Sequence, residues 1–449
     1  MHYEKFQDGT VKWIEDEIPF EVPEGWAWCK LNDIYNFIDY RGATPTKITN
    51  GIPLVTAKNV KSGYIDYTID DYISEEEFKE RQQRGISKKG DILFTTEAPL
   101  GNAALADMEK FSAGQRLITF QQYGSKNELI NYVMLMFILS DFFQQQLYVN
   151  KTGSTVAGIK AAILKTLWIP VPPYNEQLRI SNTLKSAINL IDSISKNKEI
   201  LSTSISNTKS KILDLAIRGK IVPQDPNDEP ASVLLERIRA EKEELIKQGK
   251  IKRDKKESVI FKGDDNSYYG IHLPDSWNWA SLREIALSIS DGSHNPPPNN
   301  GSGIPLLSAA NINDNSILMN EISRWITNEE WKIENQRTNI EVGDVLLTIV
   351  GSIGRSAVVQ NNNHFALQRS VAVIKPCLIN PLYLMHIVQS PQIQKWLTDN
   401  SKGTAQKGIY LNALSLMIIP IPPLAEQARI VEHIHIAYKH LDLISNALL

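Results

Sequence analysis

Two stretches of nearly identical sequence decide the fold: IPVPPYNEQLRI at residues 169–180 and IPIPPLAEQARI at residues 419–430. Each contains three prolines, which block helix formation because proline lacks the backbone N–H and restricts the residue before it. Behind the prolines, at the NEQ or AEQ step, a long helical pattern begins. Each stretch therefore predicts the point at which the chain leaves a globular domain and enters a long helix.

The two stretches belong to a repeat that runs through the chain. Chance does not produce ordered matches of this kind, so we infer an internal duplication. Between the matches, short β-type runs alternate with helical patterns such as residues 127–149, which predicts an α+β fold for each copy. Four further motif pairs recur in the same order, about 250 residues apart: PEGWAW (23–28) with PDSWNW (274–279), GIPL (51–54) with GIPL (303–306), GDILFT (90–95) with GDVLLT (343–348), and FSAGQR (111–116) with FALQR (365–369).

The repeat divides the 449 residues into five parts, and such a length suits two to four domains of roughly 100–200 residues each. We expect two similar globular domains joined by helices. The expected parts are an N-terminal extension at residues 1–20, a first domain at 21–173, a central helical spacer at 174–262, a second domain at 263–423 and a short distal helical spacer at 424–449.

Both helical patterns carry apolar residues in alternating steps of four and three. This 3.5-residue period is that of a coiled-coil seam, whereas a helix lying on a core follows a period of 3.6. Two seams in one chain predict an antiparallel coiled coil and a pseudo-two-fold repeat; the alternative is two unrelated surface helices. From Ile180 to Leu215 the first helix would be roughly 50 Å long. The seam positions are Ile180, Leu184, Ile191, Ile194, Leu201, Ile205 and Ile212 in the first helix, and Ile430, Ile434, Leu441 and Ile444 in the second.

Composition excludes several classes of protein. With 48 Lys and Arg against 51 Asp and Glu, the formal charge is −3, so any binding of nucleic acid must come from local patches. Cys29 and Cys377 stand alone, which predicts two small buried side chains in a reducing cytosol rather than a disulfide framework or a zinc site. The longest apolar run, residues 132–139, is too short to cross a bilayer and the first residues are too polar for a signal peptide, so we expect a cytoplasmic protein.

Motifs that resemble catalytic ones fail on their decisive residues. GSTVAGIK (153–160) lacks the Gly-Lys-Ser/Thr of a phosphate-binding loop, and VPPY (171–174) begins with a residue that cannot accept a hydrogen bond from a target amine. No cluster of His, Cys and carboxylates has the spacing of a metal site. We therefore expect a duplicated binding scaffold with no catalytic residue, no metal and no cofactor of its own.

Polar residues that differ between the copies are candidates for reading DNA. Arg and Lys favour guanine edges, whereas Asn favours adenine, so different sets suit different half-sites. Successive major-groove faces of B-DNA lie about 34 Å apart, a separation that a helical rod could span. The alternative is that these loops are merely solvated. The candidates are Arg41, Thr44, Lys47, Lys58 and Asn59 in the first copy and His294, Asn295 and Asn311 in the second, with Arg116 and Arg369 at equivalent positions as backbone-positioning or structural residues.

The tandem layout, the PxxW opening, the GD[IV]L motif, the IPxPPxxEQ exit into a long helix and LDLAIRGKIVPQDP (213–226) with its following helix resemble the DNA-specificity subunit of type I restriction-modification systems. The resemblance covers essentially the whole chain. It implies two target-recognition domains that read the halves of a bipartite, asymmetric site in double-stranded DNA. It also implies helices that dock two methyltransferase subunits, which carry S-adenosylmethionine, and a restriction and translocase subunit that uses ATP and Mg²⁺.

The sequence departs from the family in its distal helix. In the family the two helical regions are of comparable length, yet no segment after residues 424–449 matches residues 216–256. The first 20 residues loosely resemble the segment before Pro274, as in a circularly closed repeat. We expect the short helix to weaken docking of the methyltransferase. The alternative to the DNA-reading subunit is a duplicated, non-catalytic protein-interaction scaffold built on the coiled coil.

Overall fold

The structure is a computed structural model that describes residues 3–40, 44–68, 70–123, 129–153, 157–253, 260, 267–403 and 407–448. It divides into two compact units, residues 1–194 (unit 1) and residues 195–449 (unit 2). The division falls within the longest helix, α6 (Tyr174–Ile217).

Both units contain the same sheets in the same strand order, which confirms the predicted duplication and the α+β class. An antiparallel four-stranded sheet runs β4 (Tyr35–Asp39), β10 (Leu117–Gln122), β7 (Ile92–Thr95), β8 (Ala103–Leu105) in unit 1 and β15 (Ala286–Asp291), β23 (Val371–Pro376), β20 (Val345–Thr348), β21 (Ser356–Val358) in unit 2. A mixed three-stranded sheet runs β6 (Tyr72–Ile73), β5 (Ile52–Val55), β9 (Ser112–Ala113) and β19 (Trp325–Ile326), β16 (Ile304–Leu307), β22 (Ala366–Leu367).

Two-stranded sheets complete the pattern. The strand that carries the prolines pairs with the strand of the tryptophan motif, as β11 (Trp168–Val171) with β3 (Ala27–Lys30) and as β24 (Ile418–Ile421) with β14 (Asn278–Ser281). Ahead of them lie the hairpins β1 (Tyr3–Lys5) with β2 (Val11–Trp13), and β12 (Ser267–Tyr268) with β13 (Ile271–His272). Unit 2 also has β17 (Ile312–Asn313) paired with β18 (Ser316–Ile317).

The helices of the two units also correspond. Unit 1 has α1 (Leu31–Ile34), α2 (Glu75–Arg81), α3 (Asn131–Ile138), α4 (Asp141–Val149) and α5 (Ala161–Leu164). Unit 2 has α8 (Leu282–Ile285), α9 (Asn328–Thr338), α10 (Pro381–Val388), α11 (Pro391–Asp399) and α12 (Leu411–Ser415), together with α7 (Ala231–Lys247) and α13 (Leu424–Asn446).

The prediction of a single helix over residues 127–149 is wrong, because two helices, α3 and α4, occupy that region. The α3 helix ends at Ile138, and the Ser140 hydroxyl caps α4 by accepting a hydrogen bond from the N–H of Phe143. The Ser140 hydroxyl also donates to the Phe137 carbonyl at 2.6 Å, which satisfies the end of the first helix. The apolar pattern continues through the break, so hydrophobicity alone does not reveal it.

The glutamine of the EQ step fixes the start of each long helix to its domain. Gln177 is buried; its side-chain oxygen accepts from the N–H of Ile130 at 2.7 Å and its amide donates to the Pro172 carbonyl at 2.9 Å. Gln427 makes the same two contacts, with the N–H of Asn380 at 2.9 Å and the Pro422 carbonyl at 3.1 Å. The motif therefore sets the direction in which the helix leaves the sheet.

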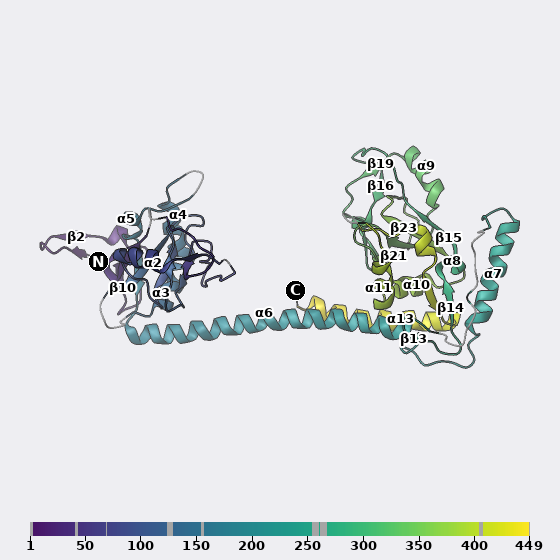
Figure 1. Ribbon diagram of the computed structural model, residues 1–449, viewed down its shortest axis with the longest axis horizontal. Helices are drawn as coiled ribbons and strands as arrows, with labels where there is room; N and C mark the ends of the chain where they lie inside the picture. Colours follow the sequence, from purple (N-terminus) through teal and green to yellow (C-terminus); the bar gives the residue numbers. More distant parts are fainter. Residues whose placement is uncertain are drawn as a thin grey trace. The chain divides into compact units, whose positions relative to one another are not determined.

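Helix α13 lies along the C-terminal part of α6, and the two run antiparallel (Figure 1). Lys209 Nζ lies 2.5 Å from Asp442 Oδ1, and the Tyr438 hydroxyl donates to the Lys209 carbonyl at 3.3 Å. Beyond the end of α6, Gln224 bonds Glu426 at the start of α13. The two helices therefore pass each other in opposite directions, as the paired seams predict.

The pairing covers only one end of the predicted seam. Ile205, Ile430 and Ile434 are buried, whereas Ile212 and Leu441 are half-buried. Ile180 and Leu184 are half-buried at the start of α6, where Ile180 packs on the core of unit 1. Ile191, Ile194, Leu201 and Ile444 stay exposed, the first two at 60% and 57%. The middle of α6 therefore presents seam residues that no other described residue covers.

Candidate nucleic-acid interface

A cleft of about 590 Å³ lies in unit 2, between the end of β15 and the segment before α12. Its polar lining contains three cations and one carboxylate, which leaves two net positive charges when His294 is neutral. The main lining residues are Asp291, His294, Arg337, Ile349, Val350, Arg369, Lys402 and Tyr410.

Asp291 organises one wall of the cleft. Its nearly buried carboxylate forms an ion pair with Arg337 from α9 and lies 2.8 Å from His294 Nε2, while Arg337 Nε donates to the Asp291 carbonyl at 2.9 Å. The next residue, Gly292, cannot be larger, because an added Cβ would lie 2.1 Å from the Leu367 carbonyl oxygen. The imidazole is half-exposed and the guanidinium of Arg337 likewise faces solvent, so both can reach a ligand.

A short closed loop forms the opposite wall of this cleft, and unit 1 has the same pair of backbone bonds. In unit 2 the N–H of Lys402 donates to Gly408 and the N–H of Gly408 donates back, at 2.8 and 2.9 Å, and Ile409 is tied to the Ile349 carbonyl. In unit 1 Thr152 and Gly158 make the same pair of bonds, at 2.7 and 3.0 Å. The tips, residues 154–156 and 404–406, lie outside the described residues. The residues on either side of the two tips thus pair in the same way in both units.

The equivalent place in unit 1 has a different charge pattern. Arg116 Nε pairs with Glu97 Oε1 at 3.1 Å, whereas Val350 stands at the position of Glu97 in unit 2 and Arg369 has no ion pair within the described residues. Lys160 occupies the position of Tyr410, whose ring is 70% exposed. The same framework therefore presents different side chains in the two units.

The structure brings together some of the candidates and separates others. The Thr44 hydroxyl donates to Gln115 at 2.7 Å, next to Arg116, and His294 and Arg369 share the unit 2 cleft. Asn295 follows His294 and is exposed. Arg41 lies outside the described residues.

The two remaining lysines of unit 1 lie elsewhere. Lys47 pairs with Asp71 at 2.7 Å, and Lys58 is exposed with no ion pair among the described residues.

Two candidates prove to be buried structural residues in this conformation. Asn59 is 3% exposed; its side-chain oxygen accepts from the N–H of Thr56 at 2.9 Å and its amide donates to the Asp66 carbonyl at 2.9 Å. Asn311 does the same with the N–H of Ser308 and the Glu321 carbonyl, at 3.0 and 2.9 Å. Both amides close a turn after the β5 or β16 strand and have no face free for a base.

Sequence reasoning missed Arg337, Lys402 and Tyr410. The signal for the last two was present, because both copies read Gly, four residues, Gly-Ile at the loop. Arg337 reaches Asp291 from 46 residues away through the packing of α9 on β15. Its signal in the sequence was the repeat, because Arg84 stands at the same place before the GD motif of the first copy.

The described residues contain no group of three or more His, Cys, Asp or Glu placed to hold a metal ion. None of the helices in the described ranges combines the length and apolar content that crossing a membrane requires. What the cleft offers is hydrogen-bond donors, positive charge and one exposed aromatic ring, which suits the binding of phosphate and base edges.

The repeat is shared with a family of known proteins. The model of the type I restriction modification DNA specificity domain matches residues 23–202 and again residues 274–448. The specificity subunit of the type I restriction enzyme EcoBI from Escherichia coli is 23% identical over 450 residues, covering 98% of this chain and 85% of that protein. The EcoEI specificity subunit from Escherichia coli is 26% identical over 516 residues, covering 99% and 83%.

Solved structures share the fold. One from a study of complex assembly and conformational transition of the type I R-M system matches with a TM-score of 0.59 at 18% identity, covering 96% of this chain and 94% of that one. The HsdS subunit from Thermoanaerobacter tengcongensis matches with a TM-score of 0.53 at 18% identity and the same coverage. Because the domain model matches both copies of the repeat, the chain belongs to the type I restriction modification DNA specificity family.

Proposed function

We propose that this chain is the specificity subunit of a type I restriction-modification complex and that each unit reads one half of a bipartite, asymmetric site in double-stranded DNA. The observation that carries the proposal is the repeated framework with unlike side chains. The closed loop and the arginine at its side recur in both units, whereas Lys160 is replaced by Tyr410 and Glu97 by Val350. Constant positioning with variable reading is what two different half-sites require.

The cleft residues divide into two kinds. Arg116 and Arg369 occupy equal places and are suited to phosphate oxygens, which position the protein without reading sequence. His294 and Tyr410 differ from their counterparts and are suited to base edges, whereas Arg337 matches Arg84 of unit 1 and belongs with the constant residues. We take residues 21–173 and 263–423 as the two target-recognition domains, with the spacers at 174–262 and 424–449.

The chemistry then belongs to partner subunits. The relatives are named as specificity subunits of restriction enzymes, which supports docking of two methyltransferase subunits and of restriction and translocase subunits on the helical spacers. S-adenosylmethionine, ATP and Mg²⁺ would be held by those partners, and this chain would act as a non-catalytic member of the complex. Because the proposed target is the DNA of the host, we expect the complex to act in the cytoplasm.

Methylome sequencing tests the proposal. We expect methylated adenines at a split motif when the gene is intact and their loss when it is disrupted. Replacing residues 21–173 by those of a relative should change one half of the motif and keep the other. If a complex that contains this chain assembles with a methyltransferase yet no split motif depends on the gene, the protein-interaction scaffold is the better account.

A further inference from the structure

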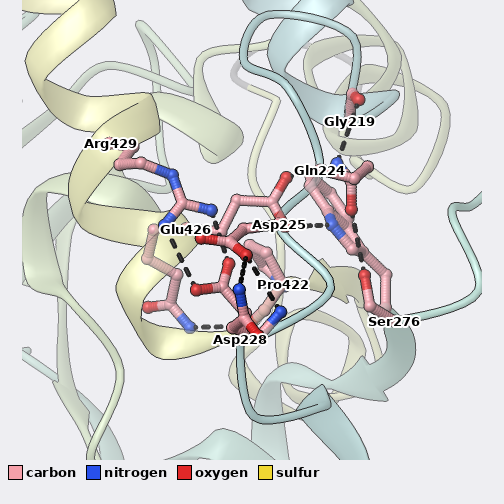
Figure 2. Close-up of polar contacts among 11 residues, drawn as sticks. Gly219, Gln224, Asp225, Asp228, Ser276, Pro422, Glu426 and Arg429 are labelled. Atoms are coloured by element: carbon pink, nitrogen blue, oxygen red, sulfur yellow. Dashed lines mark hydrogen bonds and ion pairs between the residues drawn. The ribbon is translucent and has the colours of Figure 1, made fainter.

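In unit 2 the residues that join α6 to α7 lie across the start of α13. We name residues 218–230 the strap (Figure 2). Gln224 donates to Glu426 Oε1 at 2.5 Å and accepts from the Ser276 hydroxyl at 3.0 Å. Trp277 Nε1 donates to the other oxygen of Glu426 at 2.9 Å. The strap and the tryptophan together surround one buried carboxylate.

An ion pair fixes the far end of the strap. Arg429, one turn further along α13, donates to Asp228 Oδ1 at 3.2 Å. Burial raises the pKa of Glu426, an effect that the hydrogen bonds from Trp277 and Gln224 oppose. The strap thus supplies an amide to Glu426 and a carboxylate to Arg429.

Apolar packing continues from the strap into α7. Val222 of the strap and the inner face of α7 share a core with Trp277, Ala280 and Ile285, each at most 1% exposed. Gly219 approaches so closely that an added Cβ would lie 2.6 Å from a ring carbon of Pro274. From α7, Arg239 Nη2 pairs with Glu284 Oε1 at 2.7 Å.

Unit 1 repeats the receiving side of this interface. Trp26, Glu176 and Arg179 occupy the positions of Trp277, Glu426 and Arg429. Trp26 Nε1 is buried yet has no hydrogen-bond partner, and among the described residues no side-chain bond or ion pair reaches Glu176 or Arg179. Glu426 and Arg429, which bond the strap in unit 2, and Trp277, which bonds Glu426, therefore have counterparts in unit 1 whose side chains have no polar partner among the described residues.

Burial shows the same difference. Trp26, Cys29 and Ile34 are only half-buried, whereas their counterparts Trp277, Ala280 and Ile285 are fully buried. The residues of unit 1 that are more exposed are those whose counterparts share the apolar core with the strap and α7. No described residue of unit 1 plays the part of a strap. We name Trp26, Cys29, Ile34, Glu176 and Arg179 the socket.

We propose that the socket binds a strap-like segment of a second polypeptide. Its occupant carries a primary amide for Glu176 and, four residues later, a carboxylate for Arg179, and it continues into an amphipathic helix with a basic residue facing Asp33, which stands where Glu284 stands in unit 2. Two observations support this chemistry: the charges of Glu176, Arg179 and Asp33, and the equivalent interface that the strap forms in unit 2. Residues 218–230 are engaged on unit 2, so the proposal commits to a second chain as the source of the occupant.

The test uses the full chain and a synthetic peptide of residues 214–250 as the probe. We expect saturable binding of one peptide per chain, measured by fluorescence anisotropy of a labelled peptide. Arg179→Glu should weaken binding at least tenfold, and a peptide with Asp228→Arg should recover affinity for Arg179→Glu. Lys196→Glu, an exposed charge reversal elsewhere on α6, is the matched control and should leave binding unchanged.

A second readout follows the indole of Trp26. Its N–H resonance, identified by loss in Trp26→Phe, should shift when the peptide binds, because Glu176 then accepts its hydrogen bond. The proposal is overturned if the peptide does not bind, or if binding is unaffected by Arg179→Glu, as it would be when the peptide exchanges with the strap on unit 2.

Discussion

Replacing His386 by Met should remove much of the acid sensitivity of unit 2. His386 lies on α10, is 7% exposed, and its ring stands 6.0 Å from that of Tyr438 on α13. Its Nδ1 is buried with no hydrogen-bond partner in the described structure. Burial lowers the pKa of His386 from 6.5 to about 4; a hydrogen bond that the ring donates to Gln389 opposes this shift and the neighbouring His435 adds to it.

The sign follows from where the proton binds. The pKa of His386 is lower in the folded chain than in the unfolded chain, so the unfolded chain binds a proton at a higher pH. The free energy of unfolding therefore falls as the pH drops from about 6.5 to about 4. A difference of about 2.5 pKa units corresponds to about 3 kcal/mol at full protonation. Between pH 7.5 and pH 5 the loss amounts to about 2 kcal/mol.

Met136 occupies the matching position on α3 of unit 1, so methionine suits this site in the fold. Urea unfolding at pH 7.5 and pH 5, followed by hydrogen exchange in peptides of unit 2, should show a loss smaller by about 2 kcal/mol in His386→Met than in the wild type. His440→Gln, which changes an exposed histidine on α13, is the control. If His386→Met loses as much stability on acidification as the wild type, the buried ring is not the origin of the effect.

Three further changes separate the roles assigned above. Arg369→Ala should weaken DNA binding by a similar factor for all sequences and reduce the slope of log affinity against log salt by about 1, as titrations at several salt concentrations would show. Asn311→Ala should cost about 1–3 kcal/mol of stability through the lost bonds to Ser308 and Glu321, while the methylated motif stays the same. Ending the chain at Leu441 removes the ion pair between Lys209 and Asp442 and should weaken assembly with the methyltransferase; an unchanged complex on gel filtration would contradict this.

The repeat and the helix exits could be predicted because their causes are local. Proline excludes helix at its own position, and helices α6 and α13 start at Tyr174 and Leu424, directly behind the prolines. The 3.5-residue period of the seam could also be predicted from the sequence. The period does not show, however, over what length the second helix covers the first. Ile205 is buried and Ile191 is exposed although both lie on the same stripe, because α13 covers only the C-terminal part of α6.

Individual contact residues were harder to predict, since residue type does not distinguish a free amide from a bonded one. Asn59 and Asn311 stand in polar stretches that are typical of recognition loops, yet backbone groups a few residues away consume both side chains. Arg337 is the converse case, because its position on a helix does not reveal that the packing of α9 on β15 brings it to Asp291. Predicting such residues requires the three-dimensional contacts of elements far apart in sequence.

The net charge of a whole chain is a weak guide to DNA binding, as this protein illustrates. In unit 1 several cations pair with carboxylates, such as Lys47 with Asp71 and Lys110 with Glu75, and paired charges leave little field at a distance. Arg369 and Lys402 have no such partner among the described residues, although they line one cleft. A positive site therefore arises in a chain of net charge −3 by leaving a few cations unpaired at one place, and its field acts over about a Debye length, the range at which a phosphate backbone would meet it.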